Sequence, residues 1–231
     1  MKEALHLEQC TRLPRESARD YALRFLRHNI INLHLKPGQM VSSAELAEVT
    51  GISRTPIREA MQELEKTGIL EIFPQAGSRI SYIDYGRIHE SCFIRLALEK
   101  AVVSIACEGI SLEDERALGD ILEMQEKCFE RNAPDEFLEL DHQLHFRIYK
   151  AVNRSMTYQT VQDCLWHFNR IRRLSFDALS VKRLIDDHRE LIAAILAQDK
   201  RRAKKIVQCH LTRYLDDEKV IRKKYPEYFL A

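Results

Sequence analysis

The sequence predicts a mainly α-helical protein in which an N-terminal winged helix-turn-helix precedes an all-α antiparallel bundle of about six helices. Three observations favour this fold class. Only seven glycines and six prolines occur among 231 residues, which favours long helices over many turns. Apolar residues recur at helical spacing through most of the chain. Short β-branched runs, which are typical of strands, stand only before residue 84.

Two helices are expected before residue 52, and each has a clear signal for its end. Apolar residues form a helical stripe through residues 14–35, and the sequence KPG then ends it. A second helix is expected at about 43–50, where Ser42 or Ser43 can cap its start. Gly51 can supply the left-handed residue that ends this second helix.

The third helix is expected to begin at Ser53, a good N-cap, with Pro56 in its first turn, where the missing N–H needs no partner. Gly68 is expected to end it. Its buried stripe contains Ile57, Ala60, Met61 and Leu64. The runs ILEIF and SRISYI then stand on either side of PQAG and predict a hairpin. Three helices and a hairpin make a winged helix-turn-helix domain, which we place at residues 1–83.

The remaining residues, 84–231, are expected to form an all-α domain. Apolar periodicity runs through six stretches that are separated by short polar breaks, a pattern typical of an antiparallel bundle. The six expected helices cover residues 85–108, 112–131, 134–152, 155–179, 181–198 and 200–218. The tail IRKKYPEYFLA has no clear period.

Composition excludes several classes of protein without selecting a function. The net charge is only +1, so binding to nucleic acid would depend on where the charges lie. No apolar run approaches the roughly 18 residues that a membrane span needs, and the start lacks the apolar stretch of a signal peptide. Six scattered cysteines without a CxxC pair indicate reduced thiols and a cytoplasmic protein.

The start of the third helix has the residues of a nucleic-acid contact. Arg54, Thr55 and Arg58 lie in its first turn and a half, away from the apolar stripe. Free backbone N–H groups already favour an anion there, and the planar guanidinium can bind guanine or phosphate. We therefore expect this end to enter the major groove of DNA, while Gly77 and Arg79 of the hairpin contact DNA beside it. The alternative is that these arginines are only solvated, or that Arg58 pairs with a nearby glutamate.

The stretch LKPGQMVSSAELAEVTGISRTPIREAMQELEKTGILEIFPQAGSRIS resembles the winged-helix domain of the GntR family of bacterial transcription regulators. The resemblance rests on PG, ELA, GISRTPIREA, LEKTGIL and the glycine of the wing. It implies that Arg54, Thr55, Arg58 and Gly77 contact operator DNA. Ser43 departs from the family pattern, which often has glutamate there, and this difference bears on how the second helix begins.

The bundle contains polar residues on otherwise apolar helix faces. Asp141 and His145 are four residues apart in one apolar stripe, while His188 and His210 each share an apolar face of a later helix. A lone inward histidine is usually a satisfied core residue. Four such groups on three packed helices would be costly if unpaired, and one divalent cation satisfies an aspartate and three neutral imidazoles together. Since they fall off these stripes, we expect surface positions for His89, His142 and His167.

The segments RLALE, DHQLHFRIYKAVNR, DDHRELIAAILAQDKRRAKKIVQCHL and KYPEYF resemble the FCD-type C-terminal ligand-binding domain of the FadR-like branch of the GntR family. The resemblance implies a metal site whose ligands are Asp141, His145, His188 and His210. It also implies a small metabolite, often a carboxylate, bound beside the metal. Zinc or nickel suits such histidine-rich ligation.

Three arginines of the bundle are candidates for binding that metabolite. Arg95 matches an arginine that is often near the ligand in FCD domains, and its alternative is a salt bridge to Glu99 or another acidic residue. Arg172 and Arg173 are weaker candidates, for which solvated or structural roles are favoured.

The sequence therefore predicts a transcription regulator, by default a repressor released by its effector, and not an enzyme. A homodimer on a palindromic operator is expected because one helix-turn-helix buries little surface on DNA. The alternative is a metalloenzyme with an accessory DNA-binding domain. It would need an acid or base beside the metal, and no glutamate shares the face of Asp141 and His145. A third interpretation is a structural metal without an effector.

Overall fold

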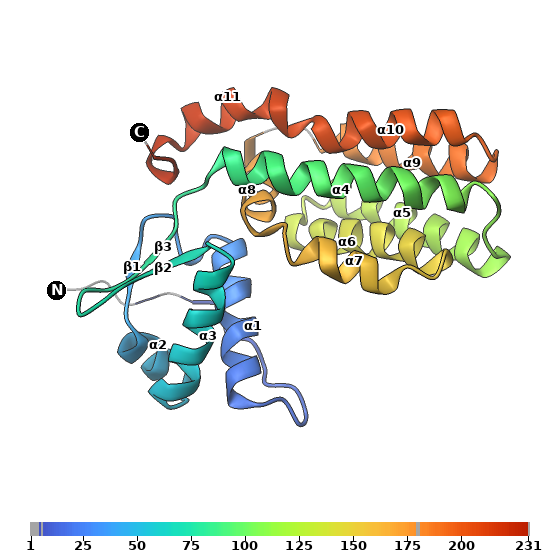
Figure 1. Ribbon diagram of the computed structural model, residues 1–231. Coiled ribbons are helices and arrows are strands. Elements are labelled where there is room, and N and C mark those ends of the chain that lie inside the picture. Colours follow the sequence, from blue (N-terminus) through green and yellow to red (C-terminus); the bar gives the residue numbers. More distant parts are fainter. Residues whose placement is uncertain (1–4, 6, 179–180, 231) are drawn as a thin grey trace. The chain divides into compact units, whose positions relative to one another are not determined.

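The computed structural model describes residue 5 and residues 7–178 and 181–230 of the chain, and these confirm the predicted fold class (Figure 1). The strands are β1 (Met40–Val41), β2 (Leu70–Phe73) and β3 (Gly77–Ile80). The helices are α1 (Ala18–Ile31), α2 (Ser43–Thr50), α3 (Arg54–Lys66), α4 (Tyr85–Ala106), α5 (Leu112–Glu130), α6 (Pro134–Ala151), α7 (Ser155–Gln162), α8 (Trp166–Ala178), α9 (Lys182–Leu196), α10 (Lys200–Thr212), α11 (Tyr214–Lys224) and the 3₁₀ turn η1 (Pro226–Tyr228).

The chain divides into two compact units, and neither is one continuous segment. The winged unit contains the residues up to Tyr85 together with Trp166–Ile171 and the residues from Arg222 onward. The helical unit contains Gly86–Leu165 and Arg172–Ile221. A boundary drawn at a single position of the sequence therefore leaves out two short segments that pack with the winged unit.

The helices of the winged unit begin and end at clear capping residues. Ser17 starts α1 by accepting a hydrogen bond from the backbone N–H of Asp20. Ser42, the first of the two predicted caps, starts α2 in a capping box with Glu45. Gly51 ends α2 with a φ of 69°, a left-handed conformation that glycine adopts without strain. Ser53 precedes α3 as predicted, but its side chain makes no capping hydrogen bond.

The wing is a three-stranded antiparallel sheet in the order β1-β3-β2. The hairpin of β2 and β3 was predicted, whereas β1 has two residues and is too short to show an alternating pattern. Gly38 precedes β1 with a φ of 81°, and a Cβ atom there would lie 2.8 Å from the ring of Tyr82. The loop before β1 therefore requires glycine for both its backbone conformation and its packing.

A distant segment of the chain completes the winged unit. Trp166 joins its apolar core, and Arg170 is fully buried. Arg170 Nη1 donates a hydrogen bond to the carbonyl of Ser81 at 2.6 Å, and Nη2 donates to the carbonyl of Tyr82 at 3.3 Å. Because these partners are neutral, burial lowers the pKa of Arg170 to about 9.

His167 was predicted at the surface, and this prediction is wrong, because only 5% of the residue is exposed. Its Nδ1 accepts hydrogen bonds from the backbone of Asp84 at 3.3 Å and from Arg170 Nη2 at 2.8 Å. Its Nε2 therefore carries the proton and donates to the carbonyl of Gly68 at 3.3 Å. The apolar periodicity of one helix could not reveal partners that lie so far away in the sequence.

The helical unit has more helices than the six that the periodicity indicates. The expected helix 155–179 is divided into α7 and α8, and the expected helix 200–218 is divided into α10 and α11 at Arg213. At the first break Cys164 and Leu165 donate to carbonyls three residues back, which tightens the turn. Neither break contains glycine or proline, so the sequence carries no signal for it.

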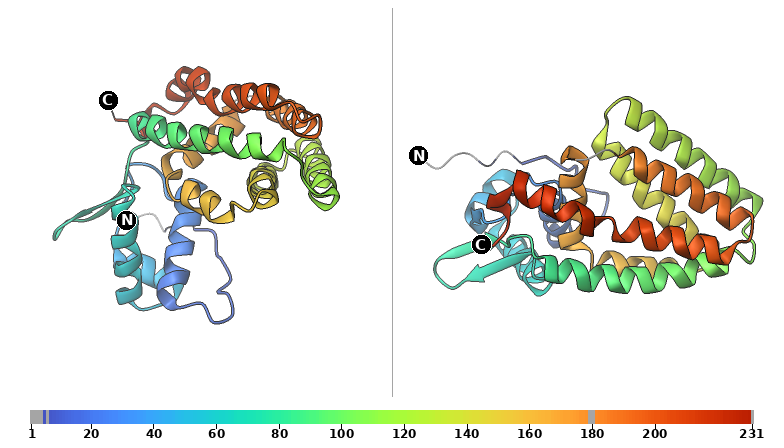
Figure 2. Two further views of the ribbon diagram at one scale, coloured as in Figure 1. Left: turned by 45° about the vertical axis from the view of Figure 1, so that its right-hand side comes forward. Right: turned by 90° about the horizontal axis from the view of Figure 1, so that it is seen from above.

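Within the helical unit, α5 lies beside α6 and α9 lies beside α10 (Figures 1 and 2). The apolar core between these helices and α4 includes Val102, Leu144, Ile148, Leu191, Ala194 and Val207. Helices α6, α9 and α10 also carry the polar residues that the sequence predicted on apolar faces. Burial of those faces brings the polar residues inside the bundle.

Candidate metal centre and candidate nucleic-acid interface

The start of α3 presents its arginines to solvent. Arg54, Thr55 and Arg58 are exposed, while the predicted stripe of Ile57, Ala60, Met61 and Leu64 is buried. Arg54 has no ion-pair partner within the described part of the chain. Among the described residues, Arg58 makes only a long hydrogen bond from Nε to Ser43 Oγ, at 3.4 Å. Two uncompensated guanidinium groups beside the free N–H groups of a helix start can bind an anion.

The alternative pairing of Arg58 with a glutamate of α3 is not found among the described residues. Glu63 Oε2 instead lies 2.9 Å from Lys66 Nζ and 3.5 Å from Arg19 Nη2. The partner of Arg58 is Ser43, the position at which the sequence departs from the GntR pattern. This contact joins α3 to α2 without neutralising the arginine.

The wing carries the other two predicted DNA contacts. Gly77 begins β3, and Arg79 stands opposite Glu71 in the register of β2 and β3. Arg79 Nη2 lies 2.6 Å from Glu71 Oε2, and its guanidinium stacks 5.1 Å from the ring centre of Phe73. The charge of Arg79 is therefore compensated within the sheet, unlike the charges at the start of α3.

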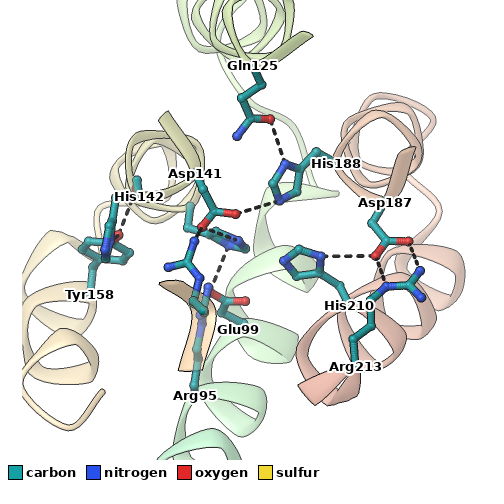
Figure 3. Close-up of polar contacts among 12 residues, drawn as sticks. Arg95, Glu99, Gln125, Asp141, His142, Tyr158, Asp187, His188, His210 and Arg213 are labelled. Carbon is teal, nitrogen blue, oxygen red and sulfur yellow. Dashed lines mark hydrogen bonds and ion pairs between the residues drawn. The ribbon is translucent and has the colours of Figure 1, made fainter. Parts of the chain in front are cut away.

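The four polar residues predicted to bind a metal come together inside the helical unit (Figure 3). Helix α6 supplies Asp141 and His145, α9 supplies His188, and α10 supplies His210. One ligand atom from each residue lies within 4.8 Å of the others. Exposed fractions of 2% for Asp141 and His145 and 0% for His188 place the cluster away from bulk water.

Each of the three histidines uses its Nδ1 atom for a polar contact with a neighbouring side chain. The contacts are His145 with Glu99 Oε1 at 3.1 Å, His188 with Gln125 Oε1 at 2.8 Å, and His210 with Asp187 Oδ2 at 3.3 Å. Since all three partners are acceptor oxygens, each Nδ1 carries a proton and each Nε2 presents a lone pair. This is the tautomer that a metal ligand requires.

The opposite nitrogens of two of these rings lack a hydrogen bond. His145 Nε2 and His188 Nε2 are buried and have no hydrogen-bond partner among the described residues. They lie 3.9 Å and 3.4 Å from the two carboxylate oxygens of Asp141. Burial lowers the pKa values of His188 and His210, which favours neutral imidazoles. A cation among these atoms would satisfy lone pairs that are otherwise buried at a cost, so the residues fit a divalent metal.

The carboxylate of Asp141 is also held by a cation from α8. Arg172 Nη2 donates to Asp141 Oδ2. Burial opposes ionisation of Asp141, but the charge of Arg172 holds the pKa of Asp141 well below its usual value. From the sequence, Arg172 was a weaker candidate for effector binding than Arg95. In the structure Arg172 directly contacts Asp141, one of the predicted metal-ligating residues. Arg173 instead contacts the exposed Asp135.

Arg95 is buried beside the cluster and forms the salt bridge that the sequence left as the alternative. Its Nε lies 3.2 Å from Glu99 Oε1, and the residue is only 3% exposed. Although burial opposes ionisation, the Arg95 charge helps to lower the pKa of Glu99 to about 2. Glu99 thereby stays a carboxylate and accepts from His145 Nδ1. It contacts the nitrogen that faces away from the proposed ion, so it is not placed as a base beside that ion.

The sequence did not predict the hydrogen-bond partners of the three histidines, Glu99, Gln125 and Asp187. Each partner lies on a different helix from its histidine, so the periodicity of one helix cannot pair them. Gln125 was the most accessible to prediction, because it interrupts the apolar stripe of α5 and is fully buried. His142 was predicted at the surface but is half-buried, and its Nδ1 lies 3.0 Å from the hydroxyl of Tyr158. His89 is exposed as predicted.

Known proteins that are similar to this chain match it over nearly its whole length. The chain is 30% identical to an HTH-type transcriptional regulator in an unstable DNA locus of Streptomyces ambofaciens, over 93% of this chain and 90% of that protein. It is 27% identical to the HTH-type transcriptional repressor RspR of Escherichia coli (strain K12), over 94% of this chain and 95% of the relative. The solved structure of E. coli McbR/YncC has the same fold, with a TM-score of 0.76 at 21% identity, covering 91% of this chain and 99% of that one.

No helix among the described residues is long and apolar enough to cross a membrane.

Two family descriptions match, and together they cover most of the sequence. Residues 22–80 match the bacterial regulatory proteins of the gntR family, and residues 90–213 match the FCD domain. The chain therefore belongs to the GntR family of transcription regulators, with a DNA-binding helix-turn-helix followed by an FCD domain.

Proposed function

We propose that the protein is a homodimeric cytoplasmic repressor whose affinity for a palindromic operator falls when a small carboxylate binds beside a divalent metal. DNA binding is assigned to residues 1–83, and metal and effector binding to residues 84–231. The observation that carries the proposal is the convergence of Asp141 and three histidines. The Nδ1 atoms of these histidines are engaged, and two of their Nε2 atoms have no hydrogen-bond partner in the described part of the chain. A regulator needs a site where an effector binds as well as a surface that binds DNA. In this proposal the cluster is the effector site.

The proposed DNA contacts are Arg54, Thr55 and Arg58 of α3 with Gly77 and Arg79 of the wing. Support comes from the uncompensated charges of Arg54 and Arg58 at a helix start. In this arrangement the arginines of α3 bind base edges or phosphates in the major groove. Arg79 contributes less, because its charge is already paired with Glu71.

The proposed metal ligands are Asp141, His145, His188 and His210. Three neutral imidazole nitrogens and one carboxylate oxygen suit a first-row divalent ion, and we favour zinc or nickel. When bound, the ion supplies a Lewis-acidic position for a carboxylate of the effector. Asp141 is oriented by Arg172, and the three rings are oriented by their Nδ1 partners.

The proposed effector is an anion because two guanidinium groups lie at the cluster. Arg172 contacts Asp141 directly, and Arg95 contacts Glu99, which in turn contacts His145. A carboxylate that binds beside the metal would be attracted by these two positive charges, which are already partly removed from water. Arg95 is therefore assigned to effector binding: it would contact the effector either in place of Glu99 or together with it.

A homodimer is supported by apolar residues that α4 leaves exposed. Phe93 is 71% exposed and Ile94 is 40% exposed. Neighbouring large apolar side chains at a surface are typical of a protein interface. A two-fold dimer would place two copies of α3 on the two halves of a palindrome.

The test begins with a duplex selected from a random DNA pool by the wild-type protein. Fluorescence anisotropy then measures its affinity for metal-loaded protein in the presence of individual small carboxylates. We expect at least one carboxylate to weaken DNA binding in the wild type and to have no effect in the His188→Ala variant. An Arg116→Ala variant, which changes an exposed arginine of α5, serves as the matched control and should respond like the wild type.

Two results would contradict the proposal. If the metal-free protein responded to the carboxylate as the loaded protein does, the cluster would not be the effector site. If chelation lowered thermal stability while no carboxylate changed DNA binding, the metal would have a structural role alone.

A further inference from the structure

A second group of metal-ligating side chains lies in the winged unit, outside the FCD domain. Glu8 precedes α1, His28 lies in its last turn, and His34 lies in the loop that follows it. His28 Nε2 is 2.7 Å from Glu8 Oε2, and His34 Nε2 is 3.1 Å from the same oxygen. One ligand atom from each of the three residues lies within 4.8 Å of the others.

We propose that Glu8, His28 and His34 form a second metal site, which binds a first-row divalent transition ion and fastens the segment before α1 to the end of α1. Two imidazoles and one carboxylate are the ligands that zinc, cobalt, nickel and copper accept. Magnesium and calcium prefer an all-oxygen environment and are not expected here. Water would complete the coordination, since the site is open to solvent.

The spacing of the ligand atoms fits such an ion. At metal–ligand distances of about 2.0–2.1 Å, neighbouring ligands of a tetrahedral site are roughly 3.3 Å apart. The two nitrogen–oxygen distances, 2.7 Å and 3.1 Å, are both shorter than this, so an entering ion would need to move the Glu8 carboxylate away from the His28 ring by roughly half an ångström. Side-chain exposures of 35% for His28, 38% for His34 and 56% for Glu8 leave each group room to adjust and leave the site accessible to an incoming ion.

A buried amide holds the backbones of the three ligands in place. The Asn29 side chain is fully buried, accepts a hydrogen bond from the Glu8 N–H at 2.8 Å and donates one to the Glu8 carbonyl at 3.1 Å. The Asn29 carbonyl accepts from the N–H of Leu35, which follows His34, at 2.9 Å. Asn29 itself follows His28. One residue therefore fixes the segments that carry all three ligands, and this is the preorganisation that a metal site requires.

An ion at this site would have a structural consequence within the winged unit. Glu8 and His28 are separated by 20 residues, and a shared ion would close that loop. A link of this kind stabilises the folded unit because the unfolded chain does not hold the ligands together. The expected effect is a rise in the unfolding temperature of the winged unit on addition of the metal.

The test is a titration of the full-length, metal-stripped protein with zinc chloride by isothermal calorimetry. We expect two zinc ions per wild-type chain and one per chain in the His34→Gln and Glu8→Gln variants. The His89→Gln variant changes an exposed histidine outside both clusters and should keep two. Circular dichroism of each variant checks the fold, and exposure of the changed side chains favours a native one.

The His188→Gln variant distinguishes the bundle site from the new site. It should lose the ion of the bundle site and keep the ion that depends on His34. The proposal is overturned if His34→Gln and Glu8→Gln bind as many ions as the wild type. It is also overturned if the wild type binds one ion that His188→Gln loses. A wild type that binds one ion lost in His34→Gln supports the new site and removes the bundle site instead.

Discussion

Arginine is used in opposite ways in the two units of the molecule. At the start of α3, Arg54 and Arg58 are exposed, and no carboxylate among the described residues compensates them. In the helical unit, Arg95 is buried against Glu99 and Arg172 contacts Asp141. The exposed pair is available for an external polyanion, whereas the buried Arg95 and the half-buried Arg172 orient carboxylates inside the protein.

The difference determines what each arginine contributes to stability. Removal of one partner from a buried ion pair leaves an uncompensated charge in a poorly solvated place, at a cost of about 3–5 kcal/mol. Substitution of an exposed arginine without a partner changes stability by no more than about 0.5 kcal/mol. The first kind of residue should therefore be detected by unfolding experiments and the second by binding experiments.

The largest expected effect follows from Arg95→Met. It leaves the Glu99 carboxylate, which is 2% exposed, without its cation and with only the hydrogen bond from His145 Nδ1 among its described contacts, so the free energy of unfolding should fall by about 3–5 kcal/mol. Urea denaturation followed by circular dichroism measures it. The double variant Arg95→Met with Glu99→Gln is the control and should recover part of the loss. A cost below about 1 kcal/mol for Arg95→Met would show that the pair is not desolvated.

The next effect is that of metal removal on the proposed bundle site. At a free zinc concentration 100 times the dissociation constant, bound metal would add about 2.7 kcal/mol to the stability of the wild type. Thermal unfolding with and without a chelator measures this difference. The variants Asp141→Asn and His188→Ala should show a smaller response, which excludes an effect of the chelator itself. An equal response in all proteins would assign the stabilisation to another site.

A smaller effect, of about 1–3 kcal/mol in DNA affinity, is expected for Arg54→Ala or Arg58→Ala. The contacts proposed to be lost are those with bases or phosphates, and none among the described residues depends on Arg54, so the unfolding temperature should stay unchanged. Anisotropy with the selected duplex measures the affinity. Arg79→Ala should weaken binding less, because Glu71 already compensates Arg79. A larger loss for Arg79→Ala than for Arg54→Ala would reverse the assignment of the main contact.

The smallest effect is expected for Glu71→Ala, which breaks an ion pair at the surface of the wing. Exposed pairs of this kind contribute about 0–1 kcal/mol to stability. The change frees the charge of Arg79, so DNA affinity should rise slightly and its dependence on salt should steepen. Affinity at two salt concentrations checks both. A weaker affinity in Glu71→Ala would mean that Glu71 positions Arg79 for DNA.

Local features of the fold could be predicted because they depend on nearby residues. The capping serine of α2, the left-handed Gly51 and the buried stripe of α3 each follow from a few neighbouring positions. The breaks at Asp163–Leu165 and Arg213 could not be predicted, since their residues are compatible with a continuous helix. The joining of Trp166–Ile171 to the winged unit depends on hydrogen bonds between residues 83 or more positions apart.

The candidate site shows the same division. The inward positions of Asp141, His145, His188 and His210 follow from the period of each helix, and the four do converge. Their partners Glu99, Gln125 and Asp187 depend on how the helices are rotated against one another. That rotation is set by packing of many side chains and cannot be derived from any single helix.

The buried guanidinium of Arg170 limits how the wing can move. It holds the carbonyls of Ser81 and Tyr82, at the point where the chain leaves the wing for α4. A lysine has one donor group on a flexible stem and could not reach both carbonyls and His167 with the same rigidity. Displacement of the first turn of α8 would leave a buried cation and two carbonyl groups without these hydrogen-bond partners. The end of the wing and the beginning of α8 should therefore move together.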